Sequence, residues 1–176
     1  MEEDLKDIYL NSAFKIQSST FIVRRHDEKN EATPQMRYFQ RNPMILVSAC
    51  LIGLSCRYDG KSNSDIRLID KLRGTNILPV CPEQLGGLAT PRPAADIYYG
   101  NGIDVLNGQA KVLTIDGQDV TEAFKRGAEQ TVFLASTLGV KQCFLKARSP
   151  SCGITAQIGV TAAKLLLKGF EIEEVG

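Results

Sequence analysis

The stretch Ile45-Leu46-Val47-Ser48-Ala49 decides the fold class of this chain. A short, continuous apolar run of this kind is typical of a strand that is buried on both faces of a parallel sheet. Two further runs of the same character follow, at Asn76–Val80 and Cys143–Ala147. The three runs together predict the core strands of one sheet.

Helical segments alternate with these runs. We expect helices at 64–72, 121–138 and 160–168 and a last strand at 170–175. Ser64 is positioned to cap the first of these helices. Residues 103–115 alternate loosely around Asn107-Gly108, a pair that favours a tight turn, and so predict a β-hairpin. The whole pattern predicts a three-layer α/β domain with a mostly parallel, Rossmann-like sheet and a small β-hairpin insertion.

Residues 1–43 differ from the rest of the chain. They are polar, carry charge clusters such as Arg24-Arg25-His26-Asp27-Glu28-Lys29, and show little periodicity beyond a short predicted strand at Thr20–Val23. This stretch ends at Asn42-Pro43, a turn signal. We expect an N-terminal extension, whose composition favours mobility over a functional tail, followed by a single α/β domain at 44–176.

The net charge of the 176-residue chain is +1, with acidic and basic residues interspersed. No basic stripe that would neutralise a row of phosphates is visible, which argues against a DNA partner and favours small ligands. No apolar run approaches the roughly 20 residues that cross a bilayer. The acidic start, Met1-Glu2-Glu3-Asp4, is unlike a secretory signal. The sequence therefore predicts a cytoplasmic protein without a membrane partner.

Three of the five cysteines follow core strands. Cys50 comes directly after the first strand, Cys81 after the second and Cys152 shortly after the third. Because the carboxyl ends of parallel strands meet at one edge of a sheet, we expect these thiols to converge there. Cys143 begins its strand and is interpreted as a buried structural thiol. Cys56 lies on the same loop as Cys50, and the pattern leaves open whether it is a ligand, a neighbouring thiol or filler.

The rest of the sequence limits the metal sites that such thiols can form. The single histidine, His26, excludes zinc sites built on two histidines, and no two cysteines have CxxC spacing. An iron–sulfur cubane accepts thiolates from distant loops and can leave one iron open. The spacing alone leaves three alternatives, namely a cluster, another metal or no metal.

Several long motifs occur in a recognisable order. They are VSACLIGLSCRYDGKSN (47–63), PVCPEQLGGLATPRP (79–93), GQDVTEAFKRGAE (117–129), LKARSPSCG (145–153) and GVTAAKLLLKGFEI (159–172). In this order they resemble the motifs of the thiouracil desulfidase family, formerly catalogued as domain-of-unknown-function family 523. The resemblance covers nearly all of 44–175 and does not reach residues 1–43.

The resemblance implies an iron–sulfur enzyme. It predicts a [4Fe-4S] cluster bound by Cys50, Cys81 and Cys152 with one open iron. It also predicts non-redox desulfuration of a thiolated pyrimidine, of the 4-thiouracil or thiouridine type, with release of sulfide. The partner is then a small thiolated nucleobase or nucleoside. Glu83 and Ser149 take the catalytic roles: Glu83 accepts a proton from the attacking water, and Ser149 hydrogen-bonds the ring or that water.

Each of these roles has a plainer alternative. Taken alone, Glu83 fits a solvated carboxylate and Ser149 fits a turn residue. Tyr58 is a candidate substrate contact through ring stacking, although a loop tyrosine also covers apolar surface. Arg148 is a second candidate contact. A choice between binding an anion and forming a structural ion pair applies to all the arginines of the motif loops, Arg57, Arg92 and Arg148.

Two other functions compete with desulfuration. A non-catalytic carrier of sulfide or of an iron–sulfur cluster shares the cysteines but does not depend on Glu83. A thiol redox module would use Cys50 and Cys56, which lie close together in the sequence.

The chain departs from the family pattern between the SPSCG turn and the GVTAAKLLL helix. Only residues 154–158 intervene, whereas the family has a longer, glycine-rich segment there. A loop beside a cluster ligand shields the metal and shapes the substrate pocket, so the identity of the substrate stays open.

Overall fold

The computed structural model describes residues 43–176, which fall within one compact unit. Residues 1–42 lie outside the described residues, so the predicted extension and the predicted strand at Thr20–Val23 stay predictions. Among residues 43–176, no helix combines the length and the apolar character needed to span a membrane.

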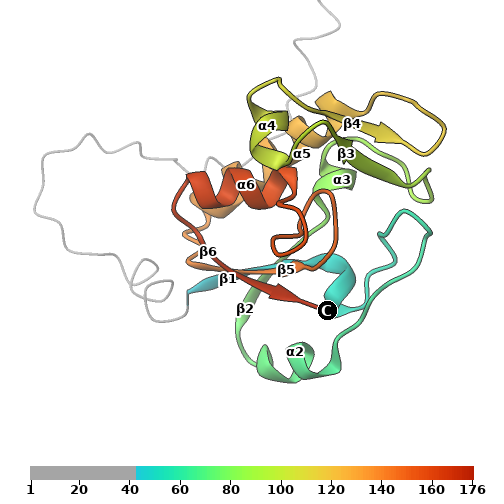
Figure 1. Cartoon of the computed structure of the whole chain (residues 1–176). Coiled ribbons are helices and arrows are strands. Elements are labelled where there is room, and N and C mark those ends of the chain that lie inside the picture. Colours follow the sequence, from blue (N-terminus) through green and yellow to red (C-terminus); the bar gives the residue numbers. More distant parts are fainter. Residues whose placement is uncertain (1–42) are drawn as a thin grey trace, which may run out of the picture. The chain divides into compact units, whose positions relative to one another are not determined.

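A four-stranded, wholly parallel sheet forms the centre (Figure 1). Its strands are β1 (Met44–Ser48), β2 (Asn76–Val80), β5 (Gln142–Lys146) and β6 (Glu171–Val175). They are arranged in the order β2-β1-β5-β6, and Val47 of β1 pairs with Pro79 of β2 and with Phe144 of β5. Pro79 fits because β2 is an edge strand, where a missing backbone donor can face away from the ladder. The predicted parallel core is confirmed.

Helices cover both faces of this sheet. One face, with Leu46 and Leu145, packs against α5 (Thr121–Thr137) and α6 (Val160–Leu167). The other face, with Val47 and Phe144, packs against α2 (Ile66–Lys71). Alternate side chains along each strand therefore enter different cores, which explains the continuous apolar runs in the sequence. The structure confirms the three layers, and Figure 1 shows α2 and α6 on opposite sides of the sheet.

The chain connections create a crevice between β1 and β5. From β1 the chain crosses through α2 to β2 on one side, and it later returns through α5 to β5 on the other side. In open parallel sheets, such a reversal of strand order leaves an opening at the carboxyl ends of the two strands. Here β1 runs into a short 3-10 helix, η1 (Ala49–Ile52), which contains Cys50.

The predicted hairpin exists in kind but was misplaced. Its strands are β3 (Ala95–Tyr98) and β4 (Lys111–Thr114), which form a separate antiparallel pair. Between them lies α4 (Gly102–Leu106), inside the segment predicted to be extended. A capping box made by Asn101 and Asp104 begins this helix, and that local pairing outweighs the turn signal of Asn107-Gly108.

Two further details correct the sequence prediction. Helix α2 begins at Ile66 and is capped by Asp65, whose side chain accepts a hydrogen bond from the Leu68 backbone N–H at 3.0 Å, so Ser64 is not the cap. Helix α3 (Pro82–Leu85), a single turn that starts directly after Cys81, was not predicted from the sequence. Its four residues are too few to show a hydrophobic period.

Helix α3 rests directly on α5. A Cβ atom built on Gly127 of α5 would overlap the carbonyl oxygen of Pro82, and one built on Gly86 would overlap the carbonyl oxygen of Ala123. The two backbones therefore meet with no side chain between them, which only glycine allows. This contact fixes the position of the residues that follow β2.

Candidate active site

The three strand-end cysteines meet at one cavity of about 560 Å³. Cys50 lies in η1, Cys81 stands between β2 and α3, and Cys152 lies in the turn after β5. All three line the cavity, and Glu83 and Ser149 line it as well. The structure thus brings together the five residues that the sequence assigned to binding and catalysis.

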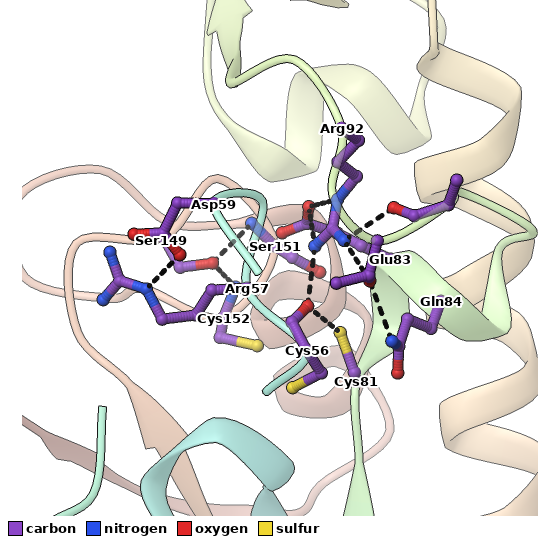
Figure 2. A network of polar contacts seen from close by, with 12 residues as sticks. Cys56, Arg57, Asp59, Cys81, Glu83, Gln84, Arg92, Ser149, Ser151 and Cys152 are labelled. Carbon is purple, nitrogen blue, oxygen red and sulfur yellow. Dashed lines mark hydrogen bonds and ion pairs between the residues drawn. The ribbon is translucent and has the colours of Figure 1, made fainter. Parts of the chain in front are cut away.

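Cys56 joins this group as a fourth thiol. It is buried, and its side chain hydrogen-bonds those of Cys50 and Cys81. The Cys81 thiol also lies 3.5 Å from the carbonyl oxygen of Cys56, to which it donates (Figure 2). Of the alternatives left open by the sequence, the structure places Cys56 beside two of the predicted ligands.

The thiols of the cavity differ in acidity. The hydrogen bond from Cys56 lowers the pKa of Cys50, and the same contact raises the pKa of Cys56 to about 11. The hydrogen bond with Cys56, followed by burial, raises the pKa of Cys81. Burial raises the pKa of Cys152 to about 12. Cys50 is therefore the thiol that loses its proton most readily, and the others need a nearby positive charge to do so.

Glu83 forms a shielded ion pair with Arg92. The carboxylate Oε2 lies 2.7 Å from the guanidinium, and the two side chains are 17% and 7% exposed. Arg92 also donates to the carbonyl oxygen of Cys56 at 3.1 Å, so it bridges the loop of Cys56 and helix α3 (Figure 2). Of the two interpretations of Arg92 offered by the sequence, the structure favours pairing with a carboxylate.

Ser149 organises the turn that carries Cys152. Its Oγ accepts hydrogen bonds from the backbone N–H groups of Ser151 and Cys152, both at 3.2 Å. The Oγ of Ser151 is buried and bonds the Oγ1 of Thr161 on α6 at 2.9 Å, which ties the turn to that helix. Ser149 therefore stabilises the turn that holds Cys152. Its hydroxyl hydrogen is still available to a ligand in the cavity.

Tyr58 and Arg148 lie where substrate contacts were predicted. Both line the cavity, and Tyr58 is 44% exposed. The Arg57 guanidinium lies 5.6 Å from the centre of the Tyr58 ring and also pairs with Asp59 at 3.3 Å. Arg148 has a left-handed backbone (φ 54°), and its side chain reaches the carbonyl oxygen of Gly176 at 3.3 Å. Arg57 thus has a structural partner, while Tyr58 presents a ring to the cavity.

Ser48 and Lys146 line the cavity without having been singled out from the sequence. The buried Oγ of Ser48 accepts a hydrogen bond from the Lys146 backbone N–H at 3.0 Å and also bonds the side chain of Cys152. Burial, followed by the charge of Arg148, lowers the pKa of Lys146. Both residues end core strands, so the rule that located the cysteines also points to them.

The short segment after the SPSCG turn forms one wall of the cavity. The backbone N–H of Ile154 and the hydroxyl of Thr155 donate to the Glu174 carboxylate at 2.7 and 2.6 Å. The Gln157 side chain donates to the carbonyl oxygen of Gly100 at 2.6 Å. Ala156 and Gln157 face the cavity. The segment is therefore anchored on both β6 and the loop before α4.

Cys143 lies apart from this group. It is fully buried inside β5, within the core cluster on the α5 and α6 side, and burial raises its pKa to about 12. The structure confirms that it is a buried thiol of the core.

Comparisons with known proteins show which proteins this chain is similar to. The 2-thiouracil desulfurase family matches residues 45–173 of the chain. The uncharacterized protein YbbK of Bacillus subtilis (strain 168) is 41% identical over 142 residues, which cover 73% of this chain and 93% of YbbK. Among solved structures, the [4Fe-4S]-dependent thiouracil desulfidase TudS (DUF523Vcz) is similar, with a TM-score of 0.64 and 37% identity, over 74% of this chain and 89% of TudS.

The family match spans the same region as the motifs found in the sequence, from the first core strand to the last. The matches confirm the resemblance to thiouracil desulfidases and the α/β fold that it implied. From its motifs, its fold and its relatives, the chain belongs to the 2-thiouracil desulfurase family.

Proposed function

We propose that this protein catalyses the [4Fe-4S]-dependent, non-redox removal of sulfur from a thiolated pyrimidine of the 4-thiouracil or thiouridine type. The family match and the likeness to TudS, itself a [4Fe-4S]-dependent thiouracil desulfidase, support this proposal. The observation that carries it is the convergence of Cys50, Cys81 and Cys152 with Glu83 on one cavity.

The donor set fits an iron–sulfur cluster better than a single metal ion. Among the described residues, no three histidine, cysteine, aspartate or glutamate side chains are placed to hold one ion. A cubane distributes protein thiolates over different irons, so its ligands stand farther apart than those of a single ion. Cys50, Cys81 and Cys152 are free thiols from three separate segments of the chain, and we assign them as the ligands of the cluster.

A cluster held by three thiolates supplies one iron with an open position, a Lewis acid with affinity for sulfur. The reaction exchanges C=S for C=O. Water supplies the oxygen and two protons, sulfur leaves as hydrogen sulfide, and no electrons are gained or lost. The residues of this chain then have to activate a water molecule and orient the pyrimidine.

Glu83 is the group assigned to water activation. Its carboxylate lines the cavity two residues from the ligand Cys81 and accepts a proton as water attacks the ring carbon. Ser149 is assigned as a hydrogen-bond donor to the ring or to that water, because its Oγ is already fixed by two backbone N–H groups. Tyr58 is assigned to stacking on the pyrimidine and Arg148 to contact with the substrate at the rim.

Anaerobic reconstitution of the full chain with iron and sulfide tests this proposal. We expect an iron and acid-labile sulfide content that matches one cluster per chain, and release of sulfide from 4-thiouracil with formation of uracil. Cys81→Ser should lose both properties. Glu83→Gln should keep the iron and lose most of its turnover, whereas Glu129→Gln, at an exposed pair with Lys164, should retain both.

Two results would contradict the assignment. If the chain binds no iron under these conditions, it cannot have a cluster-dependent activity, and the proposal is wrong. Full turnover of 4-thiouracil by Cys81→Ser would separate the reaction from the predicted ligands. A non-catalytic carrier would give a different result. The wild type would bind its cluster without turning over 4-thiouracil, and Glu83→Gln would transfer sulfide or the cluster as well as the wild type does.

A further inference from the structure

The guanidinium group of Arg92 is buried, and most of its donors are hydrogen-bonded to the protein. Nε and Nη2 both lie 2.7 Å from Glu83 Oε2. Nη1 donates to the carbonyl oxygen of Ala89 and to the hydroxyl of Thr90, both at 3.0 Å. Nη2 also donates to the carbonyl oxygen of Cys56 at 3.1 Å. Four of the five guanidinium N–H groups thus donate hydrogen bonds to protein oxygens, and Nη2 also forms an ion pair with the Glu83 carboxylate.

Arg92 is the residue that orients the Glu83 side chain. Glu83 belongs to α3, a helix of one turn that cannot by itself restrict a side chain with three rotatable bonds. Its Oε2 is held by Arg92, while Oε1 accepts no hydrogen bond from residues 43–176. Because Glu83 lines the cavity, Oε1 is the oxygen that remains for a water molecule.

The same guanidinium sets the distance between the carboxylate and the thiols. Its contact with the carbonyl oxygen of Cys56 reaches the loop that carries Cys50 and Cys56, and that carbonyl also accepts the Cys81 thiol. Figure 2 shows Arg92 lying between Glu83 and Cys56. A single side chain thus links the proton acceptor to the region of the predicted cluster ligands.

We propose that Arg92 is a positioning residue for the reaction, one that acts through Glu83 by fixing which carboxylate oxygen faces the attacking water. This inference rests on the proposed function. A misplacement of a reacting group by an ångström costs about 100-fold in rate. Loss of Arg92 should therefore lower kcat by about that factor, with little change in the affinity for the substrate or in the amount of cluster.

A double-mutant cycle on the reconstituted full chain tests this role. The variants are Arg92→Gln, Glu83→Gln and both together, assayed for iron content, kcat and KM with 4-thiouracil, under single-turnover conditions where rates are low. We expect Arg92→Gln to keep its iron and its KM and to lose about 100-fold in kcat. In the Glu83→Gln background, the same change should lower kcat by less than about threefold, because residues that act as one unit are not additive.

Two further variants separate positioning from simple support of the loops. Arg92→Lys keeps a positive charge near Oε2 but loses the fork that reaches Cys56 and Thr90, so it should recover part of the lost kcat. Arg126→Gln is the matched control, because Arg126 donates to the carbonyl oxygen of Gly86 beside α3 without contacting Glu83. It should leave kcat and iron content unchanged.

Each outcome decides between the hypotheses. Rate losses that multiply in the double variant, or an iron content that falls with Arg92→Gln and Arg92→Lys alike, would show that Arg92 only supports the fold, while the desulfidase proposal would stand. A wild-type chain that holds its cluster and fails to turn over 4-thiouracil would overturn both proposals together. Non-additive losses at constant iron content and KM would support the positioning role.

Discussion

Cys143 lies within the sheet, whereas the cysteines of the cavity lie beyond the ends of its strands. Cys143 is enclosed by apolar side chains inside β5, and burial alone raises its pKa to about 12. At the carboxyl edge, Cys56 hydrogen-bonds both Cys50 and Cys81, and its contact with Cys50 lowers the pKa of Cys50. Position along the strand therefore decides whether a thiol packs as a small apolar group or is available for chemistry.

The largest effect should come from replacing one cysteine of each region. We expect Cys152→Ser to lose the iron and all measurable turnover, since a hydroxyl is a poor replacement for a thiolate toward iron. Cys143→Ala should reconstitute like the wild type. Iron analysis and sulfide release after anaerobic reconstitution measure both properties. Equal loss of iron in the two variants would remove the distinction between edge and interior.

Ser149 lies at the same edge of the sheet as the predicted ligands but is expected to donate a hydrogen bond without binding metal. Ser149→Ala should keep most of its iron and lose about 100-fold in kcat, the usual loss for one hydrogen-bond donor to developing charge. Ser136→Ala, at an exposed position on α5, serves as the control. If the kcat of Ser149→Ala stays at the wild-type level, the role of this residue is confined to the turn.

Stability at alkaline pH sharpens the description of the interior. Cys143→Ala should lower the free energy of unfolding near neutral pH by about 1 kcal/mol, because a buried sulfur is lost. The Cys143 pKa is raised from 9.0 to about 12 in the folded state, so the unfolded chain loses this proton first as the pH rises. The advantage of the wild type should thus be complete below pH 9.0 and shrink toward pH 12.

Denaturant titrations of both chains across this range measure the difference. If the difference in the free energy of unfolding between wild type and Cys143→Ala stays constant up to the highest pH, burial does not raise the pKa of Cys143 in the folded protein.

The smallest effect is expected at Cys56, the thiol whose role the sequence left open. Cys56→Ser keeps a hydrogen-bond donor beside Cys50, and its backbone carbonyl still accepts from Arg92. We therefore expect iron content and turnover close to those of the wild type. A loss of iron similar to that of Cys152→Ser would instead identify Cys56 as a ligand.

The sheet and its main helices were predictable because the strands are continuous apolar runs and the long helices show a clear period. Within the run 45–49, Ser48 is the one polar residue. The segment 121–137 is long enough to display one apolar face. The hairpin was misplaced because Asn101 and Asp104, which cap α4, are separated by apolar residues that also fit a strand. Short elements carry too few residues for a period to outweigh a local cap.

The site was predictable to the extent that it follows from strand ends. The meeting of Cys50, Cys81 and Cys152 needed only the parallel order of the strands. The sequence left an ion pair of Arg92 as one of two alternatives, because the choice depends on how the loop after α3 returns to the sheet edge. Neither residue type nor spacing distinguishes such a pair from two solvated side chains.

The glycine contact between α3 and α5 joins parts of the molecule that are distant along the chain. Because the two backbones touch, any larger residue at Gly127 has to displace Pro82 and, with it, the neighbouring Glu83. Yet none of the residues that line the cavity comes from α5. The room that a substrate finds beside the carboxylate can therefore change through a remote substitution, with every wall of the cavity chemically the same.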